Sequence, residues 1–151
     1  MATHPFICWA RLAFAGVLVS GIAQAEPSPN TATISVNVGP LRNSKGTLAC
    51  RLHASAGGFP RTGGIVSQRV KIEGASARCV FEDVAPGTYA VVVHHDENDN
   101  RLCDRNRLGI PLEGYGVSNN HTYPMRAPTW EESKFVVEGS KETALSISLR
   151  Y

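Results

Sequence analysis

Hydrophobic and polar residues alternate along most of this chain, and a period of two predicts β-strands. In TATISVNV, for example, small or polar residues separate Ile34, Val36 and Val38. Stretches such as GPLRNSKG and ASAGGFPRTGG interrupt the alternation and predict turns. Seven strands are expected, at residues 31–38, 46–54, 65–72, 77–84, 88–95, 133–139 and 143–151.

The segment TYAVVVHH at residues 88–95 is apolar on both of its faces. In a strand, Tyr89 and His95 would point to one side, whereas Ala90 and His94 would point to the other. A strand that is apolar on both sides is typical of the centre of a sheet.

The short strands, the regular turns and the lack of a convincing helix predict an all-β fold. We expect an antiparallel β-sandwich of about seven strands, immunoglobulin-like or transthyretin-like. A small β-barrel is the alternative, because periodicity does not distinguish the two. TWEESK can form one helical turn, since Thr129 and Glu132 have capping-box spacing, but a loop or a lead-in to the next strand fits equally well.

The first 25 residues have the composition of a secretory signal peptide. One positive charge at Arg11 precedes an apolar stretch at residues 12–22, and the segment closes on Ala-Gln-Ala. The apolar stretch is shorter than the ~20 residues of a membrane-spanning helix, so no span should remain after cleavage. An uncleaved anchor is the alternative. The expected organisation is a signal peptide at 1–25, a flexible lead-in at 26–30 and a single β-sandwich domain at 31–151, periplasmic or secreted.

Charge excludes one class of partner. The chain has 15 Lys and Arg against 13 Asp and Glu, and the basic residues are dispersed along the sequence. Nucleic-acid binding requires a basic stripe, so we expect no nucleic-acid partner. The expected partner is an unknown extracellular or cell-envelope ligand.

Export would place the cysteines in an oxidising compartment, where close thiols pair. Cys50 and Cys79 lie in two predicted strands and are the preferred disulfide. Two small buried thiols are the alternative, because pairing does not follow from sequence. Cys103 would remain as an odd thiol.

The sequence HHDENDNRLCD at 94–104 is crowded with carboxylates and amides. It opens the longest segment without periodicity, from residue 96 to about 128, and a loop of such length is usually functional or held by another group. Calcium loops supply side-chain oxygens at positions 1, 3 and 5, a backbone carbonyl at 7 and another oxygen near 9. Those positions here are Asp96, Asn98, Asn100, Leu102 and Asp104. The spacing predicts a calcium loop that orders the long surface segment.

Two positions depart from the calcium pattern. Position 6, usually glycine because the chain turns sharply, is Arg101, and position 12, usually a bidentate Glu, is Arg107. Glu97, Asp99 or Glu113 would supply the missing carboxylate. We expect weak binding, with a dissociation constant of about 10⁻⁴ to 10⁻³ M. The alternative is an Asx-rich turn that holds its own backbone through side-chain hydrogen bonds.

Two further kinds of chemistry fit the sequence less well. A soft-metal site of His53, His94, His95, Cys103 and Asp96 is disfavoured, because adjacent strand residues point to opposite faces. A hydrolase or redox protein using Cys103 would need an assembled nucleophile and base. No nucleophile elbow, phosphate loop or two-histidine helix motif occurs in the sequence. We therefore expect no catalytic residues.

The phrases FEDVAPGTYAVVVHHDENDN and LGIPLEGYGVSNN resemble the bacterial exported domain-of-unknown-function family 2141, over about residues 31–151. Members show a phrase like HDENxNGxLDxN followed by GIPxEGYGxSNN. The resemblance implies a small periplasmic or secreted β-sandwich with no established activity. Arg101 and Cys103 depart from the family phrase, which has a glycine and an apolar residue at these places.

Glycines flank Tyr115 in EGYG and permit a positive φ on either side of it. The ring would then stand on a loop and could stack on a sugar or a peptide. Tyr115 is therefore the expected binding surface of a second candidate, a glycan- or protein-binding module that needs no metal. More often, such a tyrosine fixes a loop to its own domain.

Overall fold

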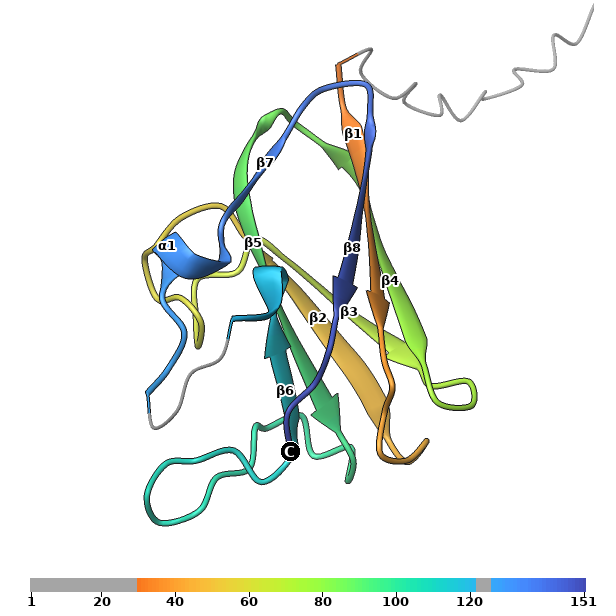
Figure 1. Cartoon of the computed structure of the whole chain (residues 1–151), viewed down its shortest axis with the longest axis vertical. Helices are drawn as coiled ribbons and strands as arrows, with labels where there is room; N and C mark the ends of the chain where they lie inside the picture. Colours follow the sequence, from red (N-terminus) through yellow and green to blue (C-terminus); the bar gives the residue numbers. More distant parts are fainter. Residues whose placement is uncertain (1–29, 122–125) are drawn as a thin grey trace, which may run out of the picture.

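The computed structural model describes residues 30–121 and 126–151, so the expected signal peptide and most of the lead-in lie outside the described residues. Within these residues the chain forms strands joined mainly by turns and loops (Figure 1). The elements are β1 (Ala32–Val38), β2 (Thr47–His53), β3 (Val66–Lys71), β4 (Ala77–Val84), β5 (Gly87–Asp96), β6 (Gly114–Val117), η1 (Ser118–Asn120), α1 (Trp130–Ser133), β7 (Phe135–Val137) and β8 (Glu142–Ile147).

The strands form two sheets, which confirms the all-β sandwich. One sheet has the order β4-β1-β8, and the other has the order β3-β2-β5-β6, with β7 also paired to β5. The predicted antiparallel pairing dominates both sheets, and β1 and β8 are the exception, since they run parallel. No tight turn connects these two strands, so chain connectivity does not impose the antiparallel direction.

One hydrophobic core lies between the sheets and follows the predicted alternation. Six of its members in β1 and β2 are each exposed by 2% or less: Ile34, Val36, Val38, Leu48, Cys50 and Leu52. Burial of one aliphatic side chain of this size stabilises the fold by roughly 1.5 to 3 kcal/mol. Strand β5 is buried on both faces, as expected of a central strand, since Ala90 and Val91 are both 0% exposed.

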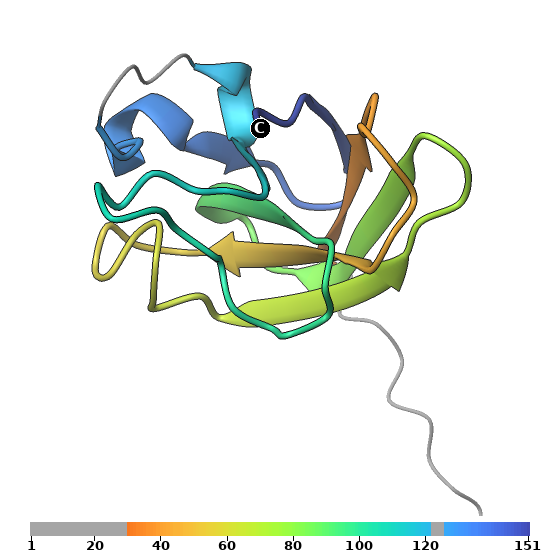
Figure 2. The ribbon, with the colours of Figure 1, turned by 90° about the horizontal axis from the view of Figure 1, so that it is seen from below.

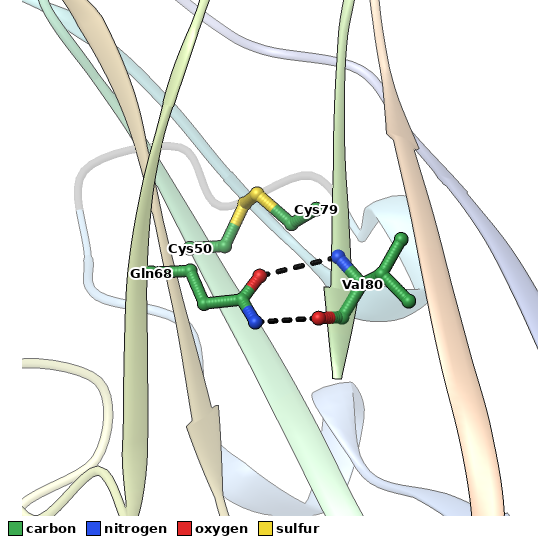
Figure 3. The surroundings of a disulfide bond; sticks show 4 residues. All are labelled: Cys50, Gln68, Cys79 and Val80. Carbon is green, nitrogen blue, oxygen red and sulfur yellow. Dashed lines mark hydrogen bonds between the residues drawn. A yellow bond between two sulfur atoms is a disulfide. The ribbon is translucent and has the colours of Figure 1, made fainter. Parts of the chain in front are cut away.

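The predicted disulfide is confirmed. Cys50 in β2 and Cys79 in β4 are bonded, with their Cα atoms 6.5 Å apart, so the bridge joins the two sheets (Figure 3). Beside it, the Gln68 carboxamide of β3 donates to the carbonyl of Val80 in β4 and accepts the Val80 N–H at 3.2 Å. This side chain extends the hydrogen bonding between the edges of the two sheets.

The chain departs from the predicted elements mainly after residue 96. Strand β6 forms inside the segment that was expected to lack structure. The last strand ends at Ile147, and the chain then crosses to β6, where Tyr115 and Arg150 exchange two backbone hydrogen bonds of 2.8 and 2.9 Å. The helical turn α1 does form, and the Glu132 carboxylate accepts the Thr129 N–H at 3.1 Å, as capping-box spacing predicts.

Candidate functional site

The acidic loop begins at Asp96, the last residue of β5, at one end of the five-stranded sheet (Figure 1). Asp96 is 0% exposed, and its carboxylate holds both the loop and the neighbouring sheet edge. One oxygen, Oδ1, accepts the Asn100 N–H at 3.1 Å. The other, Oδ2, accepts the Arg101 N–H at 2.8 Å and a guanidinium N–H of Arg69 at 2.6 Å. Asp96 therefore fixes where the loop leaves the sheet.

These contacts determine the charge state of Asp96. Burial raises its pKa, but the hydrogen bonds from the Arg69 guanidinium and the Arg101 N–H outweigh burial, and the pKa lies below its ordinary value of 3.8. At neutral pH, Asp96 is thus a buried, ionised carboxylate.

The loop turns where the calcium pattern requires a turn. Asp99 has a φ of 56° and Arg101 a φ of 65°, both in the left-handed region. The arginine at position 6 therefore adopts the conformation for which glycine is usual, at a cost of roughly 1 to 2 kcal/mol. The left-handed turn at position 6 therefore forms without the glycine.

The predicted side-chain ligands at positions 3, 5 and 9 converge. Asn98 Nδ2 donates to the Asp104 carboxylate at 2.8 Å, and Asn100 Nδ2 donates to it at 3.1 Å. The amide oxygens face the backbone: Asn98 Oδ1 accepts the Asn100 N–H at 3.0 Å, and Asn100 Oδ1 accepts the Leu102 N–H at 2.8 Å. In this arrangement the loop satisfies its own polar groups, as in an Asx-rich turn.

Glu113, the last predicted ligand, ties both ends of the loop to the sheet. Only 5% of it is exposed. Its Oε1 accepts the Glu97 N–H at 3.0 Å, its Oε2 accepts the Asp104 N–H at 3.3 Å, and Oε2 also lies 2.8 Å from His94 Nε2. Glu113 therefore adds a second carboxylate beside Asp104.

The soft-metal alternative does not form. His94 points to one face of β5 and contacts Glu113, whereas His95 points into the core, between the Tyr151 hydroxyl and the Lys45 carbonyl. Among residues 30–121 and 126–151, no three His, Cys, Asp or Glu side chains are grouped so that they could hold a metal ion. This holds also for the three predicted calcium-ligand carboxylates, Asp96, Asp104 and Glu113, so the converging side chains of the loop are Asn98, Asn100 and Asp104 alone.

Cys103 remains a free thiol, and its surroundings do not activate it. Burial is the main cause that raises its pKa above the ordinary 9.0. A nucleophilic cysteine needs the opposite shift, because the thiolate is the reactive form.

Tyr115 does not stand on a loop, which corrects the expectation from EGYG. It lies in β6, where its backbone pairs with His94 of β5. Neither flanking glycine has a positive φ. Glycine is required at both positions because neighbouring side chains occupy the space that a Cβ would take. A Cβ at Gly114 would lie 2.5 Å from the Tyr151 ring, and one at Gly116 would lie 2.8 Å from the Ile147 side chain.

Sequence reasoning missed a cavity of about 400 Å³ beside the loop. Arginines from four separate segments line it: Arg51, Arg61, Arg69, Arg101 and Arg105. Along the sequence these residues are dispersed, and no linear motif links them. Strand register, the segment at 57–64 and the acidic loop bring these dispersed residues together on one face of the sheet.

Comparison with known proteins places the chain among uncharacterised relatives. A family model described as "Uncharacterized protein conserved in bacteria (DUF2141)" matches residues 36–145, which include the acidic loop, β6 and both bridged cysteines. No curated protein and no solved structure matches the chain. In the part of the chain that the structure describes, no helix is long and apolar enough to cross a membrane.

Proposed function

The chain belongs to the DUF2141 family of bacterial proteins, and from that premise we propose that it is an exported, non-catalytic β-sandwich protein whose Asp96–Asp104 loop takes up one calcium ion. In this proposal the ion orders the surface segment between the loop and strand β6, which begins at Gly114. The bacterial family and the Cys50–Cys79 bridge support export, because disulfides persist in oxidising compartments.

The convergence of two carboxamides on one carboxylate carries the calcium proposal. Asn98 and Asn100 each direct Nδ2 at Asp104 over 2.8 to 3.1 Å. Rotation of each carboxamide by half a turn exchanges Nδ2 for Oδ1, since the two atoms are nearly equivalent in shape. The same three side chains would then present oxygens to one another, and calcium binds carboxylate and amide oxygens.

The rotation also explains why binding should be weak. The N–H groups of Asn100 and Leu102 would each lose an amide acceptor, at a cost of about 0.5 to 1.5 kcal/mol per bond. The Arg69 guanidinium, 2.6 Å from Asp96 Oδ2, further opposes a nearby cation. Both effects agree with a dissociation constant in the range of about 10⁻⁴ to 10⁻³ M for extracellular calcium sites.

Two observations support a non-catalytic role. The loop carboxylates of Asp96, Asp104 and Glu113 all accept hydrogen bonds from the chain itself. The pKa of Cys103 is raised, which keeps the thiol protonated at neutral pH.

Calcium titration of the purified protein, freed of divalent ions, tests the proposal. We expect binding heat and a rise in melting temperature at millimolar calcium. Asp104→Asn should weaken binding at least tenfold, because one anionic ligand is lost. Asp99→Asn is the matched control: it removes the same charge from the same loop, but the Asp99 carboxylate lies outside the converging group and accepts from Thr47. If 10 mM calcium produces no binding heat and no rise in melting temperature, the proposal is refuted.

A further inference from the structure

The bottom of the cavity is formed by the outer face of the five-stranded sheet, where strand pairing places four residues in one row. Arg69, Ala49, His94 and Tyr115 lie side by side on β3, β2, β5 and β6. Since successive residues of a strand point to opposite faces, this row lies opposite the core residues. Ala49 and its neighbour Ser67 are small, so this face is hollow between longer side chains, and the cavity of about 400 Å³ lies here.

Two loops complete the walls. The segment at 57–64 contributes Arg61, and the acidic loop contributes Arg101 and Arg105. Figures 1 and 2 show both segments, yellow and teal, on the same side of the molecule. We call this cavity the basic pocket, defined by Arg51, Arg61, Arg69, Arg101, Arg105 and Tyr115.

The charges of the basic pocket are only partly neutralised. No Asp or Glu lines it, and Asp96 pairs with Arg69 from outside. Arg51 donates to the Arg61 carbonyl at 2.7 Å and Arg105 to the Gly109 carbonyl at 2.8 Å, which positions both guanidiniums but leaves their charge. Arg61 and Arg101 have exposed side chains, and no ion pair within residues 30–121 and 126–151 involves them.

The lining residues indicate the class of ligand. Guanidinium groups match the planar or tetrahedral oxygens of a carboxylate or a phosphate and bind them through two parallel hydrogen bonds. An aromatic ring next to such groups packs on the flat side of a sugar or another ring. A volume of about 400 Å³ is at the small end of ligand pockets, which suits a ligand of monosaccharide size.

We propose that the basic pocket binds a small anionic ligand whose carboxylate or phosphate group meets the arginines and whose ring packs on Tyr115. This inference goes beyond the calcium proposal and does not depend on it, because the loop that supplies Arg101 and Arg105 is held by its own hydrogen bonds.

Thermal shift and calorimetric titration with defined probes test the inference. The probes are glucuronate, glucose 6-phosphate and inorganic phosphate, with glucose as the neutral control, in a calcium-free, non-phosphate buffer treated with chelating resin. We expect saturable millimolar or tighter binding of at least one anionic sugar, weaker binding of inorganic phosphate and no binding of glucose. The stronger of the two anionic sugars identifies the acid group that the site prefers.

A pair of charge-matched variants separates the pocket from a general charge effect. Arg61→Gln with Arg101→Gln should weaken binding at least tenfold. Lys45→Gln with Arg107→Gln removes the same charge from exposed positions outside the pocket and should leave the affinity within twofold. Equal losses in both double variants, or no binding of any anionic probe, would overturn the inference. The absence of calcium throughout keeps this result separate from that of the calcium titration.

Discussion

At the scale of one residue, Asp96 shows which features of the site can be predicted from the sequence and which cannot. Its place at the end of the valine-rich strand and the alternating oxygens after it were sufficient to predict the loop. The left-handed turn at Arg101 also followed from the spacing. Its partner Arg69 was not predictable, because it lies 27 residues earlier and meets Asp96 only through the pairing of β2 with β3 and β5.

Removal of the Asp96 charge should destabilise the protein. Asp96→Asn places a neutral carboxamide against Arg69 and against the N–H of Arg101, so the buried carboxylate that both groups contact is lost, while the Arg69 side chain keeps 32% of its surface in water. We expect a loss of about 1 to 3 kcal/mol in the free energy of unfolding, measured with urea at pH 7. Asp99→Asn, at an exposed position, should change it by about 0.5 kcal/mol or less. A change that small in Asp96→Asn would show that the ion pair contributes little.

The lowered pKa of Asp96 makes this stabilisation depend on pH. A carboxyl whose pKa is lower in the folded state stabilises the fold above its ordinary value of 3.8 and loses that contribution as pH falls through the folded value. The difference in unfolding free energy between the wild type and Asp96→Asn should therefore be constant from pH 7 to about 5 and should shrink below about 4. Urea titrations across this range measure it. A difference that is still undiminished at pH 2.5 would contradict the lowered pKa.

At the scale of elements, strand β6 is the strand that the hydrophobic pattern did not predict. Strand prediction depends on alternating apolar side chains, and Gly114 and Gly116 supply none. Both glycines face inward, where the Tyr151 ring and the Ile147 side chain occupy the space that a Cβ would need. That space is set by the C-terminal residues, more than 30 positions away, so β6 became recognisable as a strand only in the folded chain.

Gly116→Ala should therefore destabilise the protein although Gly116 has an ordinary backbone conformation. The new methyl would lie 2.8 Å from Ile147 Cγ2 and 2.9 Å from the Ser148 carbonyl oxygen, so the chain after β8 must shift. Overpacking of this kind costs about 1 to 3 kcal/mol, which thermal unfolding can measure. Gly57→Ala is the control, because its new methyl would meet only the Ser55 hydroxyl, at 3.7 Å. Gly74→Ala is unsuitable as a control, because the positive φ of Gly74 would itself strain an alanine. Equal stability of the two variants would contradict the packing argument.

At the scale of the whole molecule, the sequence predicted the sandwich and its central strand but not the gathering of arginines. The core follows from local alternation, which each strand carries by itself. The basic pocket instead requires register between β3, β2 and β5 together with the placement of two loops, and neither is encoded in a local pattern. The parallel pairing of β1 with β8 was missed for the same reason.

The disulfide between the sheets allows a test of how much the sandwich depends on long-range links. Cys50 and Cys79 are 29 residues apart, and closure of a loop of that length in the unfolded chain is worth about 3 to 4 kcal/mol in the chain-entropy model. Reduction should therefore lower the melting temperature by roughly 10 to 15 °C. Cys50→Ala with Cys79→Ala should lower it at least as far, since two buried sulfur atoms are also lost, and this variant should not respond to reductant. Cys103→Ser, which leaves the bridge intact, should retain the full response. A reduced wild type that melts within 2 °C of the oxidised protein would mean that core packing and the Gln68 contacts alone hold the two sheets together.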